Sequence, residues 1–182
     1  KKYKIDIVTG SFIEKEEDKL ENVSYYIDSL GEVKARYVKI NLWHPEKRYL
    51  SPGKNLKIFN TKYGKAAIVI CWDLAFSDLF REMLKKGVKI IYCPSYWTFE
   101  DASMGLKWNK NADKLLVDSL CSTRAFEANG AIVYCNASGK LSLGKFQGHL
   151  LGHSQICLPY LGAVKKLKHQ KEEMFIEELD LD

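Results

Sequence analysis

The middle of the chain alternates between short apolar runs and amphipathic stretches. Residues 66–70 are continuously apolar, which is the pattern of a strand buried on both faces of a sheet. From Ser77 to Lys86, apolar residues recur at one-, three- and four-residue intervals. This spacing predicts a helix with Ser77 as its N-cap and Gly87 as its end. Cys71 lies between the predicted strand and the predicted helix.

The rest of the pattern predicts strands on both sides of this unit and a second helix. Residues 29–31 are expected to form the turn of a hairpin, residues 43–55 a loop, and residues 98–113 a long loop or irregular helix. Because strands alternate with helices in the middle and hairpins lie near the ends, we expect an α/β or α+β fold with a mixed sheet. Strands are expected at residues 5–8, 23–27, 33–38, 56–60, 66–70, 88–92, 131–135, 153–158 and 174–179, and helices at 77–86 and about 114–128.

The composition is typical of a single globular domain. The chain has 182 residues, of which 46% are hydrophobic, and no apolar run approaches the roughly 20 residues that span a bilayer. The net charge of +5 comes from scattered lysines rather than from a basic face with interleaved aromatic residues. We therefore expect one domain over residues 1–182 that binds neither membrane nor nucleic acid.

The cysteines point to chemistry at one position. Five cysteines, an odd number without a CxxC pair, favour neither a disulfide framework nor a zinc site, so we expect a cytoplasmic protein without metal or cofactor. Cys71 is the candidate nucleophile, because α/β enzymes place nucleophiles where a buried strand ends before a helix. The alternative is that its side chain is a small buried hydrophobe. The other cysteines are expected to pack in the core: Cys93, Cys121, Cys135 and Cys157.

A cysteine nucleophile needs a base, donors for the oxyanion and a pocket that positions the carbonyl group. The usual base is a histidine, but no histidine here stands in a pattern that marks it as the partner. The alternative is a carboxylate base with a lysine that stabilises charge. Lys39 ends a predicted strand before a loop with Trp43 and Glu46, and is either that lysine or an exposed strand-end charge. The histidines are His44, His149, His153 and His169.

Several ordered motifs follow one another with compatible spacing from about residue 5 to residue 181. A lysine segment at residues 39–53 precedes a cysteine segment at residues 70–81 that contains Cys71-Trp72-Asp73. Together they resemble the nitrilase superfamily of carbon–nitrogen hydrolases, and the Cys-Trp-Asp sequence is similar to that of its amidase-like branches. Further matching segments are residues 87–91, 94–97, 124–129, 152–154 and 176–180.

The resemblance implies a role for the residues of the two main motifs. Cys71 would attack the carbonyl carbon and form a thioester with the acyl part of the substrate. Lys39 and the backbone N–H of Trp72 would stabilise the tetrahedral intermediate, and Glu46 would help to orient the site.

The resemblance also implies a fold, an activity and an assembly. The family fold is a four-layer α-β-β-α sandwich, usually paired into dimers through its helices. The expected activity is hydrolysis of a non-peptide amide or carbamoyl group of a small molecule, with Tyr96 and Trp97 in contact with the substrate. We expect a homodimer or a higher homo-oligomer.

One family residue has no match in this sequence. The general-base glutamate of the family precedes the lysine by some tens of residues, and the residues before Lys39 match the segment that follows it. Glu14, Glu16 and Glu17 lie in a charged, turn-like stretch and are not assigned this role. We therefore expect a domain without its first β-α-β unit, and the alternative function is a catalytically inactive binding or interaction protein. An unrelated cysteine hydrolase that uses His153 is a third interpretation.

Overall fold

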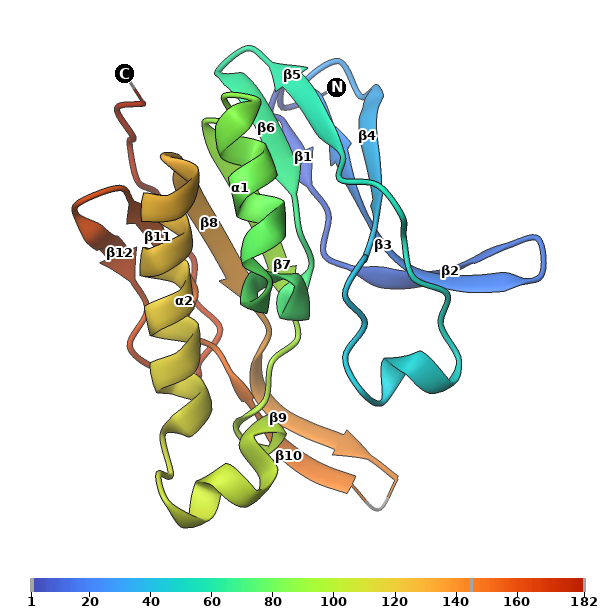
Figure 1. Cartoon of the computed structure of the whole chain (residues 1–182), viewed down its shortest axis with the longest axis vertical. Helices are drawn as coiled ribbons and strands as arrows, with labels where there is room; N and C mark the ends of the chain where they lie inside the picture. The colour runs from blue at the N-terminus through green and yellow to red at the C-terminus, as the bar shows by residue number, and fades with distance from the viewer. Residues whose placement is uncertain (1, 145, 182) are drawn as a thin grey trace.

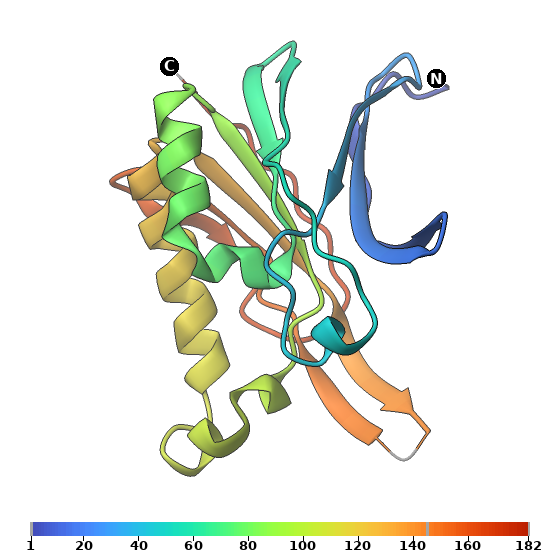
Figure 2. The ribbon, with the colours of Figure 1, turned by 45° about the vertical axis from the view of Figure 1, so that its right-hand side comes forward.

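Two stacked β-sheets and one layer of helices make up the protein, in a computed structural model that describes residues 2–144 and 146–181 (Figure 1, Figure 2). The strands of the smaller sheet are β1 (Ile7–Val8), β2 (Phe12–Glu16), β3 (Lys19–Ile27) and β4 (Val33–Val38). Those of the larger sheet are β5 (Ile58–Thr61), β6 (Gly64–Ile68), β7 (Ile90–Ser95), β8 (Ala131–Asn136), β11 (Gln155–Leu158) and β12 (Gly162–Lys166).

The larger sheet is mixed, as the sequence pattern predicts. Its strand order is β12-β11-β8-β7-β6-β5, in which β6, β7 and β8 run parallel and the outer pairs are antiparallel. In the smaller sheet, β3 pairs with β1 and β2 along one edge and with β4 along the other. The predicted hairpin with its turn at residues 29–31 is confirmed as the β3–β4 pair.

The two faces of the larger sheet bury different layers. Along β6, Ala66 and Ile68 pack toward the smaller sheet, in a cluster with Tyr26 and Tyr37, whereas Ala67 packs toward the helices. Every residue from 66 to 70 is fully buried. The apolar run is therefore confirmed as a segment that is buried on both faces of the sheet.

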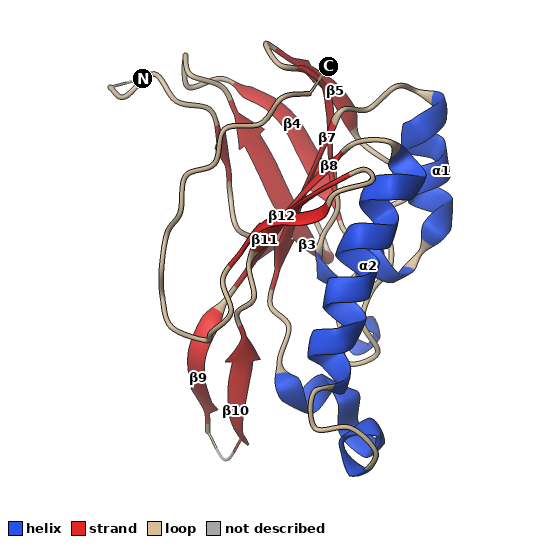
Figure 3. Ribbon diagram, turned by 90° about the vertical axis from the view of Figure 1, so that its left-hand side faces the viewer, coloured by secondary structure: helices blue, strands red, loops and turns tan. Residues whose placement is uncertain are grey.

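Helices α1 (Ser77–Lys85) and α2 (Ala112–Ala128) cover the face of the larger sheet that points away from the smaller one (Figure 3). Both predicted helices are confirmed, and Gly87, with a φ of 69°, follows the end of α1. The N-cap of α1 is Phe76 rather than Ser77, which is already the first helical residue. Such one-residue shifts are common because helix ends fray. Of the helices described, none combines the length and the apolar character that crossing a bilayer requires.

Several strand predictions are corrected. Residues 174–179 form no strand, and the side chains of Met174 and Ile176 point into solvent instead of a core. Glu14 and Glu16 lie on β2 rather than in a turn, and Glu17, with a φ of 54°, begins the turn that follows. The pattern also misses β12 and the hairpin of β9 (Ser138–Leu143) and β10 (Phe146–Leu151), because Ser, Gly and Lys dominate β9 and resemble a loop.

Three short 3₁₀ helices complete the fold: η1 (Glu46–Arg48), η2 (Cys71–Ala75) and η3 (Phe99–Lys107). The irregular helix predicted within residues 98–113 is confirmed, because η3 is broken at Ser103, where φ is 46°. All three lie in loops at the same end of the two sheets (Figure 1).

A buried carboxylate connects the smaller sheet to the turn that carries Cys71. The Asp73 side chain is fully buried in η2. Its Oδ2 accepts hydrogen bonds from the Tyr37 hydroxyl on β4 (2.7 Å) and from the Ile70 N–H (2.9 Å). Its Oδ1 accepts two from Asn41, from the backbone N–H (2.7 Å) and the side-chain amide (3.0 Å). Since all four partners donate, the site suits an ionised carboxylate, although burial raises the pKa of Asp73.

We predict that Asp73→Asn lowers the free energy of unfolding by about 2–4 kcal/mol. The substitution replaces one carboxylate oxygen by an NH₂ group, which cannot accept the hydrogen bonds that this oxygen accepts. Urea unfolding followed by tryptophan fluorescence measures the change. Asp18→Asn is the matched control, since Asp18 lies exposed in a turn and its loss is expected to cost less than about 0.5 kcal/mol. Equal stability of the two variants would show that the four hydrogen bonds do not support the fold.

Candidate active site

Cys71 occupies a strained turn at the end of a buried segment. The chain is extended at Ile70, and Cys71 then adopts a φ of 49°, in the left-handed region that residues other than glycine rarely enter. Such backbone outliers cluster at functional sites. Arg124, on α2, holds the turn from behind by donating hydrogen bonds to the carbonyl groups of Leu74 (2.9 Å) and Ala75 (3.2 Å).

Lys39 forms a buried ion pair with Glu46. The Lys39 side chain is 2% exposed, and its Nζ lies 2.6 Å from Oε2 of Glu46. Glu46 also accepts hydrogen bonds from the side-chain amide of Asn22 (2.8 Å) and from the N–H of Trp43 (2.7 Å). Of the two interpretations of Lys39, the exposed strand-end charge is therefore wrong. A buried ammonium needs such a partner, because an unpaired buried charge is strongly destabilising.

One cavity of about 300 Å³ brings the candidate residues together. Cys71, Lys39 and Glu46 line it, and so do Tyr96 and Trp97, which follow the end of β7. Residues that are far apart in sequence thus meet around a volume that suits a small molecule.

Trp72, the predicted oxyanion donor, does not line the cavity with its side chain. Its ring packs near those of Trp43, at a centroid distance of 4.6 Å, and Trp97, at 5.6 Å. The indole thus supports the wall behind the cavity, and the oxyanion role of its backbone N–H stays a prediction.

Among the polar residues of the cavity that sequence reasoning misses are Asn22 and Asp101. Asn22 lies within β3 and is 8% exposed; an asparagine inside a strand is unusual and is the signal that marks it. Asp101 stands three residues after Thr98 at the start of η3, and its Oδ2 accepts the Thr98 N–H at 2.8 Å. The Thr-x-x-Asp spacing resembles a capping box, which would have placed this carboxylate at a helix start.

The Cys71 thiol is protonated at neutral pH. Burial raises the pKa of Cys71 to about 11, against the opposing effects of the Lys39 charge and a hydrogen bond from the Tyr96 backbone. The carboxylates of Asp101 and Glu46 raise this pKa further. Within residues 2–144 and 146–181, no carboxylate or histidine ring is hydrogen-bonded to the Cys71 sulfur.

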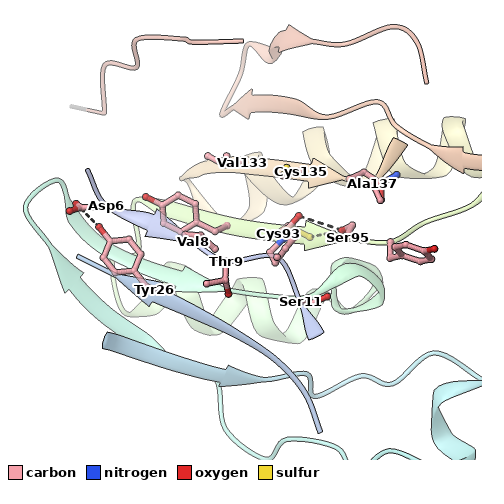
Figure 4. Close-up of a pocket in the computed structure, with 15 residues that line it drawn as sticks. Asp6, Val8, Thr9, Ser11, Tyr26, Cys93, Ser95, Val133, Cys135 and Ala137 are labelled. Carbon is pink, nitrogen blue, oxygen red and sulfur yellow. Dashed lines mark hydrogen bonds between the residues drawn. The ribbon is translucent and has the colours of Figure 1, made fainter. Parts of the chain in front are cut away.

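A second cavity, of about 530 Å³, adjoins the first and shares Ser11 and Tyr96 with it (Figure 4). Cys135 lines this second cavity and is exposed, so its predicted place in the core is wrong. The reason is geometric: Cys135 lies on the same face of β8 as Val133, which packs toward the smaller sheet, but the Cys135 side chain borders the open volume of this cavity instead of the apolar cluster (Figure 4). The core positions of the remaining cysteines are confirmed: Cys93, Cys121 and Cys157.

Among the described residues, no histidine supplies a side chain to the cavity that contains Cys71, although His44 lies between two lining residues, Trp43 and Pro45. His153, the base of the third interpretation, is buried at a left-handed position after β10, and burial lowers its pKa. The geometry therefore gives no support to a cysteine–histidine pair.

Comparisons with known proteins identify relatives over the whole chain. The family model described as carbon-nitrogen hydrolase matches residues 1–182. A probable nitrilase of Schizosaccharomyces pombe is 31% identical over 188 residues, which cover 100% of this chain and 61% of that protein. The omega-amidase NIT3 of Saccharomyces cerevisiae is 26% identical over 190 residues, which cover 98% of this chain and 60% of that protein.

Solved structures share the fold. Nit3 of Saccharomyces cerevisiae, a member of branch 10 of the nitrilase superfamily, aligns with a TM-score of 0.78 at 26% identity, over 94% of this chain and 58% of that one. A carbon-nitrogen hydrolase from Helicobacter pylori G27 aligns with a TM-score of 0.84 at 22% identity, over 94% of this chain and 61% of that one. The chain spans about three fifths of the length of these relatives. The expected nitrilase-like α/β fold is confirmed, and the chain belongs to the carbon–nitrogen hydrolase family of the nitrilase superfamily.

Proposed function

We propose that this chain carries the nucleophile, the lysine and the orienting glutamate of a thiol-dependent hydrolase that cleaves an amide or carbamoyl group of a small molecule. One observation carries the proposal: Cys71, in a left-handed turn, lines the same cavity as the buried Lys39–Glu46 ion pair. The thiol can act as the nucleophile, and the buried ammonium of Lys39 can stabilise the charge that develops on the carbonyl oxygen.

The proposed reaction proceeds through a thioester. The Cys71 thiolate attacks the carbonyl carbon, and the electron pair of the C=O bond moves to oxygen, where the Lys39 ammonium and the Trp72 N–H stabilise it. When the intermediate collapses, the C–N bond breaks and the nitrogen leaves as ammonia or amine with the proton taken from the thiol. Water then attacks the thioester, releases the acid and restores the thiol.

Glu46 orients the lysine in this scheme and does not serve as the base. Its carboxylate accepts hydrogen bonds from Lys39, Asn22 and the Trp43 N–H, so both of its oxygens are engaged. We propose that a general base takes the proton of the thiol during turnover and delivers it to the leaving nitrogen.

Several relatives are named as amidases. The omega-amidase NIT3 and the 2-oxoglutaramate amidase of Bacillus subtilis are among the proteins similar to this chain. In a solved mutant of the amidase from Nesterenkonia sp. AN1, the acetamide moiety of fluoroacetamide is added covalently at the active-site cysteine. That adduct shows the cysteine of the relative as a nucleophile, and we extend this nucleophilic role to Cys71. We also propose a homodimer, since α2 exposes Leu115, Leu116 and Phe126 on its outer side. We propose a cytoplasmic location because five cysteines without a CxxC pair favour a reducing compartment.

A catalytically inactive binding protein is the second candidate. The observation that favours it is the protonated Cys71 thiol: its pKa is raised to about 11, and no carboxylate or histidine ring among the described residues is hydrogen-bonded to its sulfur. Such a protein would bind small amides in the same cavity without turning them over.

We predict that the protein releases ammonia from at least one member of a panel of small amides and carbamoyl compounds, measured with a coupled enzyme assay. Cys71→Ala abolishes the release, and Lys39→Ala lowers kcat by about 10²-fold or more because the oxyanion loses its buried cation. Lys54→Ala is the matched control and stays fully active, since Lys54 is a lysine outside the cavity. If every amide binds and none is turned over, the inactive binding protein is the correct interpretation.

We predict that the rate of Cys71 alkylation by iodoacetamide rises about tenfold per pH unit from pH 8 to pH 10, because only the thiolate reacts and its pKa is raised to about 11. Peptide mass spectrometry measures the rate at each pH. Lys39→Met is expected to slow the reaction at every pH in this range, since the Lys39 charge favours the thiolate. A rate that levels off below pH 9 would contradict the raised pKa of the Cys71 thiol.

A further inference from the structure

Asp101 introduces an unbalanced negative charge into the cavity that contains Cys71. Lys39 and Glu46 also line this cavity and neutralise each other at 2.6 Å. Asp101 forms no ion pair with any of the described residues; its polar contacts are with Thr98, whose N–H donates to its Oδ2. The three charged groups of the lining therefore carry a net charge of −1 when all are ionised.

The carboxylate is partly desolvated and close enough to Cys71 to act on it. Asp101 is half-buried, and burial raises its pKa while the contacts with Thr98 lower it. Its charge is among the groups that disfavour the Cys71 thiolate. A cation bound in the cavity would pair with the partly desolvated Asp101 carboxylate. It would also offset the effect of the Asp101 charge on Cys71 and so favour the thiolate.

Aromatic side chains line the same cavity. Trp43, Tyr49, Tyr96 and Trp97 all contribute to it. Trp97 is held firmly, because its ring N–H donates to Asp113 at 3.0 Å and its backbone N–H donates to Asn136 at 2.8 Å. Aromatic faces attract ammonium and guanidinium groups, more strongly where water is excluded.

We propose that the substrate carries a cationic group, an ammonium or guanidinium, which Asp101 and the aromatic walls bind while Cys71 attacks the amide or carbamoyl carbon. This inference rests on the proposed function and adds the substrate class. The preference is local, because the whole chain has a net charge of +5 and its overall field favours anions.

Charged thiol reagents test the proposal at the cysteine itself. The full chain is treated with methanethiosulfonates that carry a trimethylammonium group, a sulfonate group or no charge, and peptide mass spectrometry gives the rate at each cysteine. We expect the ammonium reagent to modify Cys71 at least about tenfold faster than the sulfonate reagent. Asp101→Asn is expected to reduce this ratio by about fivefold or more, because it removes the charge and keeps an oxygen for the Thr98 N–H.

Three controls separate a charge effect from a structural one. Asp101→Glu keeps the carboxylate and is expected to keep the ratio. Glu100→Gln makes the same charge change one residue away, outside the cavity and beside His149, and is expected to leave the ratio at Cys71 unchanged. Cys135, exposed in the neighbouring cavity, is the reference within each sample, and its ratio is expected to be the same with and without Asp101.

The outcomes distinguish this inference from the proposed function. Equal ratios at Cys71 in the wild type and Asp101→Asn, or faster modification by the sulfonate reagent, would overturn the cationic substrate and leave the nucleophile intact. If no reagent modifies Cys71 while Cys135 reacts, the cysteine is not accessible and the proposed function fails together with the inference.

Discussion

The placement of the site depends on the buried carboxylate of Asp73. Its four hydrogen bonds join the Tyr37 hydroxyl on β4, the Asn41 segment and the N–H of Ile70. These groups belong to the strand and loop that precede and follow Lys39 and to the turn of Cys71. The Asp73 carboxylate bonds to all of these donors at once. When the four hydrogen bonds form, they fix the distance between the loop that follows Lys39 and the turn that carries Cys71. The two sheets otherwise meet through apolar side chains, which do not specify such a register.

The electrostatics of the cavity follow from burial. Lys39 can remain buried because Glu46 pairs with it, and Glu46 is held in turn by Asn22 and the Trp43 N–H. The same burial keeps Cys71 protonated, so the ammonium of Lys39 does not by itself produce a thiolate. A fixed Lys39 ammonium is compatible with a protonated Cys71 thiol. If a base removes the proton only during turnover, the thiol stays protonated in the resting state and is protected from side reactions.

The sequence predicts the parts of the structure that local pattern or a matched motif specifies. The buried segment at residues 66–70, both helices and the β3–β4 hairpin are confirmed, because apolar periodicity and turn residues determine them. Cys71, Lys39 and Glu46 are predicted from motifs, and the structure brings them to one cavity. The sequence marks Asn22 as an unusual residue within a strand and Asp101 as a residue at a helix start, but it does not place either in the cavity. Their place there, like the exposure of Cys135, depends on which residues of another element lie opposite. The strand expected at residues 174–179 fails for the same reason: an alternating pattern does not provide a partner strand.

The central claim is that Cys71 forms a covalent acyl intermediate, and peptide mass spectrometry tests it most directly. The protein is mixed with an amide that it binds, quenched in acid within the first turnover and digested. We expect the peptide that contains Cys71 to gain the mass of the acyl group, and we expect hydroxylamine to remove that mass, as it does for a thioester. An acyl group on any other residue, or turnover without an adduct in Cys71→Ala and wild type alike, would contradict the account.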